Sequence, residues 1–339
     1  MEYVNLGSSG LKISKVILGC MSFGDKEWAE WLLQEEEALK IFEYAYKAGI
    51  NTWDTADVYS NGASEEIVGK ALTKLNIRRE SVVIMTKCHF LVDDPKKPPT
   101  VMNTNDGPHV NRVGLSRKHI FDAVEASVKR LGTYIDVLQI HRLDKATPAE
   151  EIMRALNDVI EKGWVRYIGA SSMPAWQFQR LQNTAEKHGW FKFISMQDLY
   201  NLIYREEERE MIPYCNATGV GIIPWFAVAA GVLTRPWSDE SSKRAQTDSF
   251  AKQIVHSNST ENDKAIVSRL EEVAQKKSVP MAQVAIAWLL SKGANPILGL
   301  TKPQRIDEAV AALKVKLTEE EIKYLEEPYV PKPVIGYEQ

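Results

Sequence analysis

The stretch Asn51-Thr52-Trp53-Asp54-Thr55-Ala56-Asp57-Val58-Tyr59 puts a carboxylate and a phenol five residues apart where a short apolar strand ends. Turn-prone Ser60-Asn61-Gly62 follows before a helix begins. Alone this pair is weak evidence, because an aspartate at a strand end more often caps a turn and a nearby tyrosine more often packs. Its significance grows because other strands along the chain also end on polar residues.

Short apolar runs that fit buried strands recur along the whole chain. In order they are Val16–Gly19, Ile50–Asp54, Val82–Lys87, Asp136–His141, Val165–Ala170, Phe193–Gln197, Val220–Trp225 and Pro296–Gly299. Segments with helical periodicity lie between them. Residues 116–131 form one, with Ser116 as its cap and Gly132 at its end. Another has Pro280 in its first turn and stops at Gly293.

Eight strands alternating with helices predict an α/β fold of the (β/α)8 TIM barrel type rather than a doubly wound sheet. Residues 2–14 alternate around a glycine- and serine-rich turn and predict an N-terminal β-hairpin. The absence of a Gly-x-Gly-x-x-Gly motif after the first strand argues against a Rossmann fold. No repeat or low-complexity linker divides the sequence, so we expect a single domain over residues 1–339.

Two long irregular stretches, residues 90–115 and 234–262, interrupt the alternation. Long loops in a compact domain are usually functional lids or disordered segments. Both stretches follow a strand, on the C-terminal face where a barrel keeps its active site. We therefore interpret them as lids.

Composition indicates a protein with a small-molecule partner. The hydrophobic content of 44% suffices for a core, and the net charge of −3 provides no basic field for nucleic acid or an anionic membrane. Three widely spaced cysteines without a CxxC motif indicate reduced thiols and no metal site. The N-terminus lacks the blocks of a signal peptide, and the longest apolar run, residues 220–233, is too short to span a bilayer. We expect a soluble, cytoplasmic protein.

In a barrel the C-terminal ends of all strands meet at one mouth. The polar or aromatic residues expected there are Asp54, Tyr59, Lys87, His141, Ser171, Ser172, Gln197 and Trp225. Each one alone has a structural explanation, such as a loop tie or a hydrogen-bonded core histidine. Together they indicate a functional site, since each buried polar group left unpaired would destabilise the fold by roughly 1–3 kcal/mol.

A phenol, an ammonium, a carboxylate and an imidazole suit protonation of a carbonyl oxygen. A lysine beside Tyr59 favours the phenolate, so we expect Tyr59 to release a proton readily while Asp54 holds Lys87 charged and in place. His141 can bind the same oxygen and orient the substrate. No nucleophile elbow or metal cluster accompanies these residues, so hydrolysis fits less well.

Four motifs resemble those of the aldo-keto reductase superfamily, in the right order and over nearly the whole chain. They are Asp54–Gly62 with Ser64-Glu65, Met85-Thr86-Lys87, Tyr134–Asp144 and Gly163–Ser172. The chain most resembles the fungal aryl-alcohol-dehydrogenase-like branch. The resemblance implies a hairpin closing the barrel bottom and a catalytic tetrad of Asp54, Tyr59, Lys87 and His141, with Tyr59 as general acid.

The resemblance also implies that NADPH lies extended across the mouth and gives a hydride to an aldehyde or ketone, reversibly. A second class stays open, an NADP-binding regulatory subunit resembling potassium-channel β subunits, which share the cofactor and the tetrad. The cofactor contacts implied are Ser171, Ser172 and Gln197 on the nicotinamide carboxamide, Trp225 stacked on the ring, the loop of Gly231, Leu233 and Arg235 at the pyrophosphate, and Gly299, Thr301, Lys302, Arg305 and Glu308 towards the adenosine end.

The adenosine assignment also has a physical basis. Lys302 and Arg305 flank Pro303 at a helix start after the eighth strand, and a helix N-terminus with two cations favours an anion. This pattern favours a 2′-phosphate and therefore NADP over NAD. The alternative is a pair of solvated charges on a helix.

Several positions depart from the family pattern. Phe226-Ala227 replaces a common Ser-Pro, Ala230 a common Arg, Ala309 a common Asn, and Cys20-Met21 a common Thr-Trp pair. For the substrate we expect an apolar pocket suited to aromatic or extended aliphatic carbonyl compounds, with core packing as the alternative for each residue. The candidates are Met21, Phe23, Trp28, Trp31, Phe90 and Phe226.

Overall fold

The fold is built on a ring of eight parallel strands. The computed structural model describes residues 1–93, 103–239 and 261–337. The strands lie in the order β10-β3-β4-β5-β6-β7-β8-β9. The backbone N–H groups of Asn295 and Ile297 donate to the carbonyl oxygens of Ile222 (2.9 Å) and Pro224 (3.0 Å), which closes the ring between the last strand and β9. The predicted barrel is confirmed. The strands are β3 Ile17–Gly19, β4 Thr52–Asp54, β5 Val83–Cys88, β6 Ile135–Ile140, β7 Val165–Ser171, β8 Phe193–Gln197, β9 Gly221–Ile222 and β10 Ile297–Leu298.

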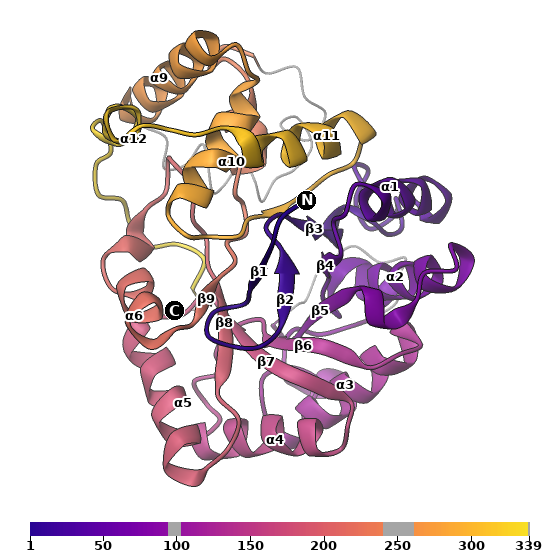
Figure 1. Ribbon diagram of the computed structural model, residues 1–339. Coiled ribbons are helices and arrows are strands. Elements are labelled where there is room, and N and C mark those ends of the chain that lie inside the picture. The colour runs from indigo at the N-terminus through magenta and orange to yellow at the C-terminus, as the bar shows by residue number, and fades with distance from the viewer. Residues whose placement is uncertain (94–102, 240–260, 338–339) are drawn as a thin grey trace.

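Helices follow the strands and surround the ring (Figure 1). They are α1 Glu35–Lys47, α2 Ala63–Lys74, α3 Arg117–Leu131, α4 Ala149–Glu161, α5 Ala175–His188, α6 Met211–Thr218, α9 Glu261–Lys277, α10 Met281–Ser291, α11 Pro303–Ala311 and α12 Glu319–Glu326. The Ser116 hydroxyl caps α3 by accepting from the His119 N–H, and Gly132 ends it with φ of 67°. Pro280 lies at the cap of α10, outside the predicted first turn, because its ψ of 147° is extended.

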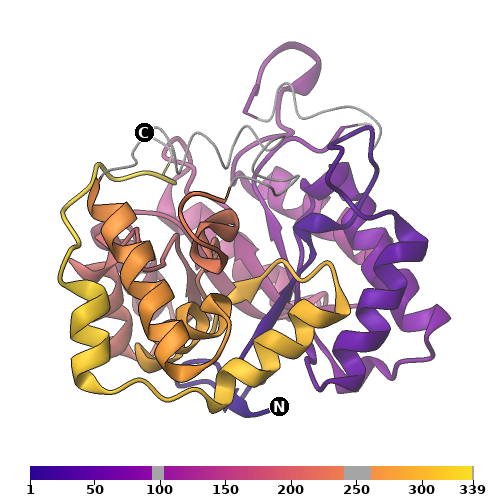
Figure 2. The ribbon, with the colours of Figure 1, turned by 90° about the horizontal axis from the view of Figure 1, so that it is seen from above.

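The N-terminal hairpin closes the bottom of the barrel. Strands β1 (Tyr3–Asn5) and β2 (Lys12–Ser14) pair antiparallel, as predicted. Leu6 and Ile13 are fully buried in one cluster with apolar residues of the barrel strands and with the residue that follows β9. These are Ile17, Val83, Met85, Val137, Ile223 and Ile297. The N-terminus therefore lies at the end of the barrel that the hairpin closes (Figure 2), which leaves the other end for a site.

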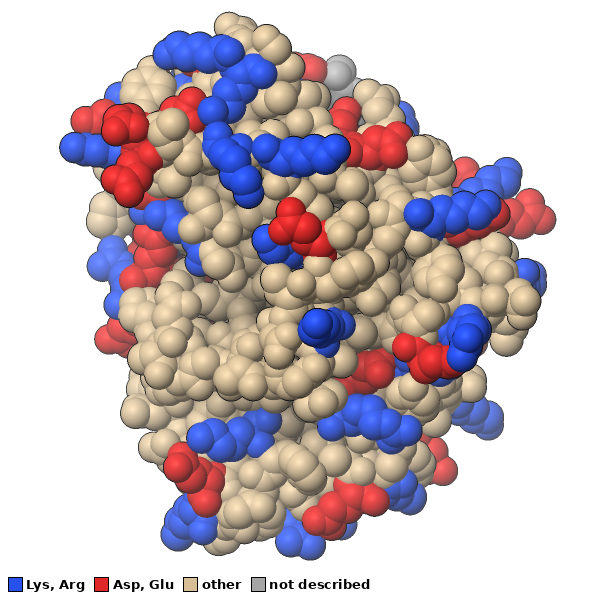
Figure 3. Space-filling model, in the orientation of Figure 1, with Lys and Arg blue, Asp and Glu red and all other residues tan. Residues whose placement is uncertain are grey.

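The surface around the hairpin carries charges of both signs, interspersed over the face seen in Figure 3. No helix of the described residues is long and apolar enough to cross a membrane. The two loops interpreted as lids include residues 94–102 and 240–260, which lie outside the described residues.

Candidate active site

A buried ion pair lies at the C-terminal end of neighbouring strands. Asp54 ends β4 and pairs in register with Met85 of β5, so Lys87 lies two residues further on and faces the same side. The Lys87 ammonium donates to Asp54 Oδ2 over 2.6 Å. Lys87 has no exposed surface and Asp54 is 2% exposed. At this depth a single unpaired charge would be strongly destabilising, so the two groups depend on each other.

Tyr59 completes the coordination of the lysine. The short helical turn η2 (Tyr59–Gly62) contains Ser60 and Asn61 with φ of 49° and 46°, and this turn holds Tyr59 over the strand ends. Lys87 Nζ lies 3.2 Å from Tyr59 Oη and 2.8 Å from the carbonyl oxygen of Thr55. An ammonium has three N–H donors, so Asp54, Thr55 and Tyr59 together account for all of them.

His141 follows β6 and joins the same group. Its backbone N–H donates to the carbonyl oxygen of Cys88 over 3.0 Å. Its ring meets the rings of Tyr59 and Phe90 edge-on, with centroids 5.8 Å and 4.9 Å away. Its Nδ1 atom is buried without a hydrogen-bond partner among the described residues. The structure thus brings all four residues of the expected tetrad to one end of the barrel.

Burial sets the protonation states of this group. Burial raises the pKa of Tyr59 above its usual value, and this effect outweighs the opposing charge of Lys87. The expectation of a readily ionised phenol is therefore wrong. Burial acts to lower the pKa of Lys87, but Asp54 and Tyr59 together raise it. Burial, then Lys87, hold the pKa of His141 well below its usual value, so the imidazole is neutral.

Gln139 is a site residue that the sequence analysis missed. Its Nε2 donates to Asp54 Oδ1 over 2.8 Å, and Gln197 Nε2 donates to the same oxygen over 3.0 Å. Gln139 lies two residues before His141 on a predicted strand, so the period-two alternation already placed both side chains on the same side. The search for polar residues at the strand ends does not reach this position, because Gln139 lies inside its strand.

Four expected nicotinamide contacts lie together beside the tetrad. The Ser171 hydroxyl donates to the carbonyl oxygen of Gln197 over 2.7 Å. The Trp225 indole N–H donates to the Ser172 hydroxyl oxygen over 3.0 Å. The guanidinium of Arg142 lies 5.8 Å from the centre of the Trp225 ring. An aromatic face, hydroxyls and an amide therefore line this side of the mouth.

The next loop has an unusual backbone. In the turn η6 (Ala229–Thr234), Ala229, Ala230 and Gly231 have φ of 47°, 51° and 95°. The N–H groups of Ala229 and Gly231 donate to the carbonyl oxygens of Phe226 (2.8 Å) and Val228 (2.9 Å), so backbone hydrogen bonds within the loop hold this turn. Leu233 is fully buried, and its backbone N–H donates to the carbonyl oxygen of Val228 over 3.3 Å. Arg235 donates from Nε to the carbonyl oxygen of Asp239 over 2.7 Å.

The expected adenosine contacts surround the N-terminus of α11. Lys302 is the cap residue of α11 and makes no side-chain capping bond. Lys302 and Arg305 are exposed, and Arg305 Nη1 donates to Thr301 Oγ1 over 3.1 Å. Gly299 is exposed before this turn and Glu308 is half-buried within α11. Ala309 is fully buried, so at this departure from the family pattern the side chain packs into the core.

Comparison with known proteins identifies the family. Residues 15–329 match the model described as the aldo/keto reductase family. The chain belongs to this family. It is 63% identical over 338 residues to the versiconal hemiacetal acetate reductase of Aspergillus parasiticus, covering 98% of each chain. It is 57% identical to a protein of Schizosaccharomyces pombe (98% and 97% covered) and 53% identical to one of Saccharomyces cerevisiae (98% of each), both provisionally named aryl-alcohol dehydrogenases.

This aldo-keto reductase also has a second buried polar group behind Lys87. Glu65 is fully buried and accepts from Thr86 Oγ1 (2.5 Å) and Arg130 Nε (2.6 Å). Asp57 donates its backbone N–H to the Lys87 carbonyl oxygen over 3.1 Å. Burial, then Glu65, raise the pKa of the Asp57 carboxyl well above its usual value. The motif residues around Tyr59 therefore also fix the backbone that carries Lys87.

The expected substrate-pocket residues separate into two groups. Phe90 lies against His141, and Phe226 lies 5.8 Å from Trp225 between ring centres. Met21 and Trp28 are half-buried, and no described contact joins them to the tetrad. Phe23 is fully buried with its ring 5.1 Å from Phe42, which fits the alternative of core packing.

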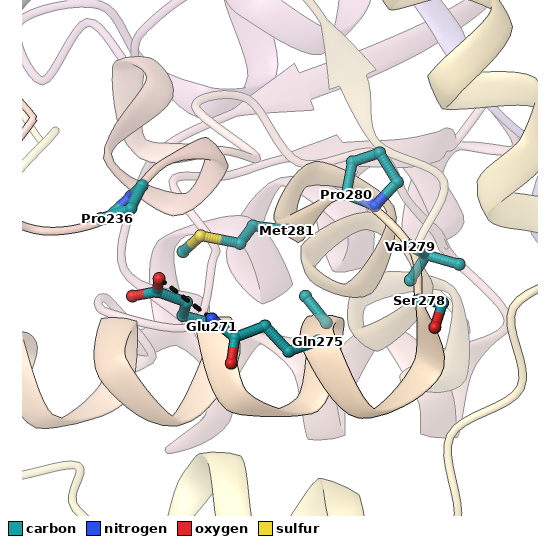
Figure 4. Close-up of a pocket in the computed structure, with 8 residues that line it drawn as sticks. Pro236, Glu271, Gln275, Ser278, Val279, Pro280 and Met281 are labelled. Carbon is teal, nitrogen blue, oxygen red and sulfur yellow. Dashed lines mark hydrogen bonds between the residues drawn. The ribbon is translucent and has the colours of Figure 1, made fainter.

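A cavity of about 470 Å³ lies elsewhere, where the end of α9 meets the start of α10 (Figure 4). Its lining residues are Pro236, Glu271, Ala274, Gln275, Ser278, Val279, Pro280 and Met281. None of the tetrad lines it. This cavity therefore lies apart from the group of residues at the barrel mouth.

Proposed function

We propose that this protein reduces aldehydes or ketones to alcohols with NADPH, reversibly, and that Tyr59 is the proton donor. The observation that supports this most is the contact chain from Tyr59 Oη to Lys87 Nζ (3.2 Å) and on to Asp54 Oδ2 (2.6 Å). Bound NADPH would supply the hydride. The residues of the chain would supply the proton and the stabilising charges.

The raised pKa of Tyr59 keeps the phenol protonated at neutral pH, so it can donate to a carbonyl oxygen. As the proton leaves, negative charge develops on Tyr59 Oη beside the Lys87 ammonium, which stabilises it. Asp54 keeps Lys87 charged despite its burial. In the oxidative direction the phenolate takes the proton back. Neutral His141 can hydrogen-bond the substrate oxygen and orient it.

The polar groups of the mouth fit the nicotinamide end of a dinucleotide cofactor. Ser171, Ser172 and Gln197 offer hydrogen bonds beside the face of Trp225. We assign the pyrophosphate to the loop of Gly231, Leu233 and Arg235 on the resemblance to the family. Two exposed cations, Lys302 and Arg305, at the start of α11 suit a 2′-phosphate and favour NADP over NAD.

For the substrate we propose aromatic aldehydes and their alcohols, because two relatives are named for aryl alcohols and Phe90 lies against His141. The hemiacetal acetate named for the Aspergillus relative is a second compound to test. We further propose that residues 1–339 act as one barrel domain. A cytoplasmic location is supported by three buried thiols at Cys20, Cys88 and Cys215.

The substitution Tyr59→Phe tests the proposal. It removes the proton donor and keeps the ring, so turnover of a benzaldehyde panel should fall by at least about 10²-fold. The Kd for NADPH, from quenching of tryptophan fluorescence, should change less than about twofold, because in this proposal the Tyr59 hydroxyl contacts the substrate oxygen and not the cofactor. Tyr46→Phe is a matched control. Tyr46 lies on the outer helix α1, and its hydroxyl is 2.9 Å from Ser81 Oγ, so this variant loses the same group away from the tetrad.

Undiminished turnover in the Tyr59→Phe variant would refute the assigned role. A wild-type protein that binds NADPH and releases it slowly, yet reduces no carbonyl compound of the panel, would instead favour the regulatory-subunit function.

A further inference from the structure

Three polar side chains form a closed triangle inside the barrel, one from each of the alternate strands β4, β6 and β8. Gln139 Nε2 donates to Asp54 Oδ1 (2.8 Å), Gln197 Nε2 donates to the same oxygen (3.0 Å), and Gln197 Nε2 also donates to Gln139 Oε1 (2.7 Å). All three are at most 2% exposed. Alternate strands share one layer of a barrel interior, and that layer is usually filled by branched apolar residues.

The carboxylate fixes the orientation of both amides. An ionised aspartate only accepts hydrogen bonds, so each glutamine must turn its NH2 group towards Asp54. Gln139 then presents its carbonyl oxygen to Gln197. Gln197 Nε2 therefore lies between two acceptors, and a rotation of this amide would set its oxygen against both. Both N–H donors of Gln197 are used, and within the described residues no group donates to its Oε1.

We propose that Gln139 is a positioning residue that fixes the hydrogen-bonding polarity of Gln197, so that Gln197 offers an acceptor and selects a ligand group carrying an N–H donor. The inference rests on the proposed function, in which the ligand beside Gln197 is the nicotinamide ring. Its primary carboxamide carries such a donor. Ser171 lies against the same residue, because its hydroxyl donates to the Gln197 backbone carbonyl oxygen over 2.7 Å.

Cofactors that differ only at the carboxamide test this polarity in the wild-type protein. The 3-acetylpyridine analogue of NADP replaces the NH2 by a methyl group and leaves the Gln197 acceptor unpaired. The nicotinic acid analogue carries a carboxylate, which only accepts hydrogen bonds and whose negative charge repels the partially negative Oε1 atom of Gln197. Kd values from tryptophan quenching should rise about tenfold or more for the first analogue and further for the second, because an unpaired buried acceptor is costly.

Two substitutions then separate the acceptor of Gln139 from its bulk. Gln139→Met keeps the length and removes the acceptor, so Asp54 alone holds Gln197. The preference for NADP over the acetylpyridine analogue should narrow several-fold, on the order of one hydrogen bond. In Gln139→Glu, burial beside Asp54 favours the protonated carboxyl, whose hydroxyl donates to Asp54 while its carbonyl oxygen remains an acceptor for Gln197, so this variant should retain the wild-type preference. A residue that only fills space would not produce this difference.

Gln182→Met is the matched control. Gln182 is also a buried glutamine that uses both its groups, donating to the Phe193 carbonyl oxygen (3.0 Å) and accepting from the Phe193 N–H (2.9 Å) at the opposite end of β8. Its loss should lower stability without changing the cofactor preference.

The outcomes are distinguishable. A wild-type preference in Gln139→Met, or a wild-type protein that binds the three cofactors equally, would overturn the inference and leave the proposed function standing. A wild-type protein that binds none of them would reject the proposed cofactor and the inference with it. If Gln139→Met does not fold, the wild-type series and Gln139→Glu still decide, since loss of preference in Gln139→Glu contradicts the role of the acceptor.

Discussion

Replacing Lys87 with methionine keeps most of the side-chain volume and removes the charge that Asp54 and Tyr59 share. The substitution leaves Asp54 as a carboxylate that is 2% exposed, without its cation. Breaking a buried pair by removing one partner typically costs about 3–5 kcal/mol. Two amides still donate to Asp54 Oδ1 and partly compensate, so we expect about 3 kcal/mol, the low end of that range.

The same change should abolish most turnover. Lys87 lowers the pKa of Tyr59 against the effect of burial, so its loss raises the pKa of the phenol further and leaves the phenolate without a counter-charge. We expect a decrease in kcat of about 10²–10⁴-fold, the range for general acid catalysis. Stability is measured by urea unfolding, and turnover by NADPH absorbance with a benzaldehyde.

The double variant Asp54→Asn, Lys87→Met makes the experiment decisive. It contains no unpaired buried charge, so it should regain about half or more of the lost stability while turnover stays low. Lys47→Met serves as control, because this lysine is 71% exposed and pairs with an exposed Glu43, and should change stability by less than about 1 kcal/mol. If the double variant is no more stable than Lys87→Met, the buried ion pair is refuted. If Lys87→Met keeps its turnover, the role of Lys87 in proton donation is refuted.

Two further predictions concern the cofactor and pH. Lys302→Ala and Arg305→Ala should each raise the KM for NADPH about tenfold and the KM for NADH by less than about twofold, since we propose that the two charges bind the 2′-phosphate that only NADPH carries. An equal effect on both cofactors in steady-state assays would contradict this. Burial raises the pKa of Glu207 from 4.5 to about 7, although Tyr337 donates to both its oxygens over 2.7 Å. The folded protein thus holds a proton that the unfolded chain has lost, so stability falls as the pH rises from about 4.5 through 7. Glu207→Gln should remove this loss, on the order of 1–3 kcal/mol near pH 8 and almost nothing near pH 4. Thermal melts of the two proteins that run parallel across this range would contradict the assignment.

The strands were predictable because a parallel barrel strand is buried on both faces and so appears as an unbroken apolar run. All eight runs overlap a strand of the structure. The errors lie at the ends. The predicted run Val220–Trp225 contains a strand of only Gly221–Ile222, and Pro224 within the run has no N–H to donate to a neighbour. Such ends depend on which neighbour each N–H meets, and the apolar pattern does not contain that information.

The tetrad residues could be expected at one place because parallel strands direct all their C-terminal ends to one mouth. The place of Lys87, for example, could be predicted from the strand it belongs to and from its position near the end of that strand. To predict Gln139 as a site residue, one must also consider polar residues that face the barrel interior before the strand ends. Its partners Asp54 and Gln197 come from strands 85 and 58 residues away in sequence, so the hydrogen bonds follow from barrel register and not from any local motif.

The protonation state of Tyr59 shows where sequence reasoning reaches its limit. The sequence suggested that Lys87 would lie near Tyr59, and a nearby ammonium lowers the pKa of a phenol. Burial acts in the opposite direction, and its size depends on how much protein covers the hydroxyl. In the structure burial is the larger effect, so the pKa of Tyr59 lies above that of free tyrosine. The Lys87 ammonium nevertheless lies 3.2 Å from Tyr59 Oη, where it can stabilise the phenolate. A proton donor of this kind stays protonated at neutral pH, and the phenolate that forms on proton transfer is stabilised by Lys87. Both properties suit reduction of a carbonyl group better than the readily ionised phenol that the sequence predicts.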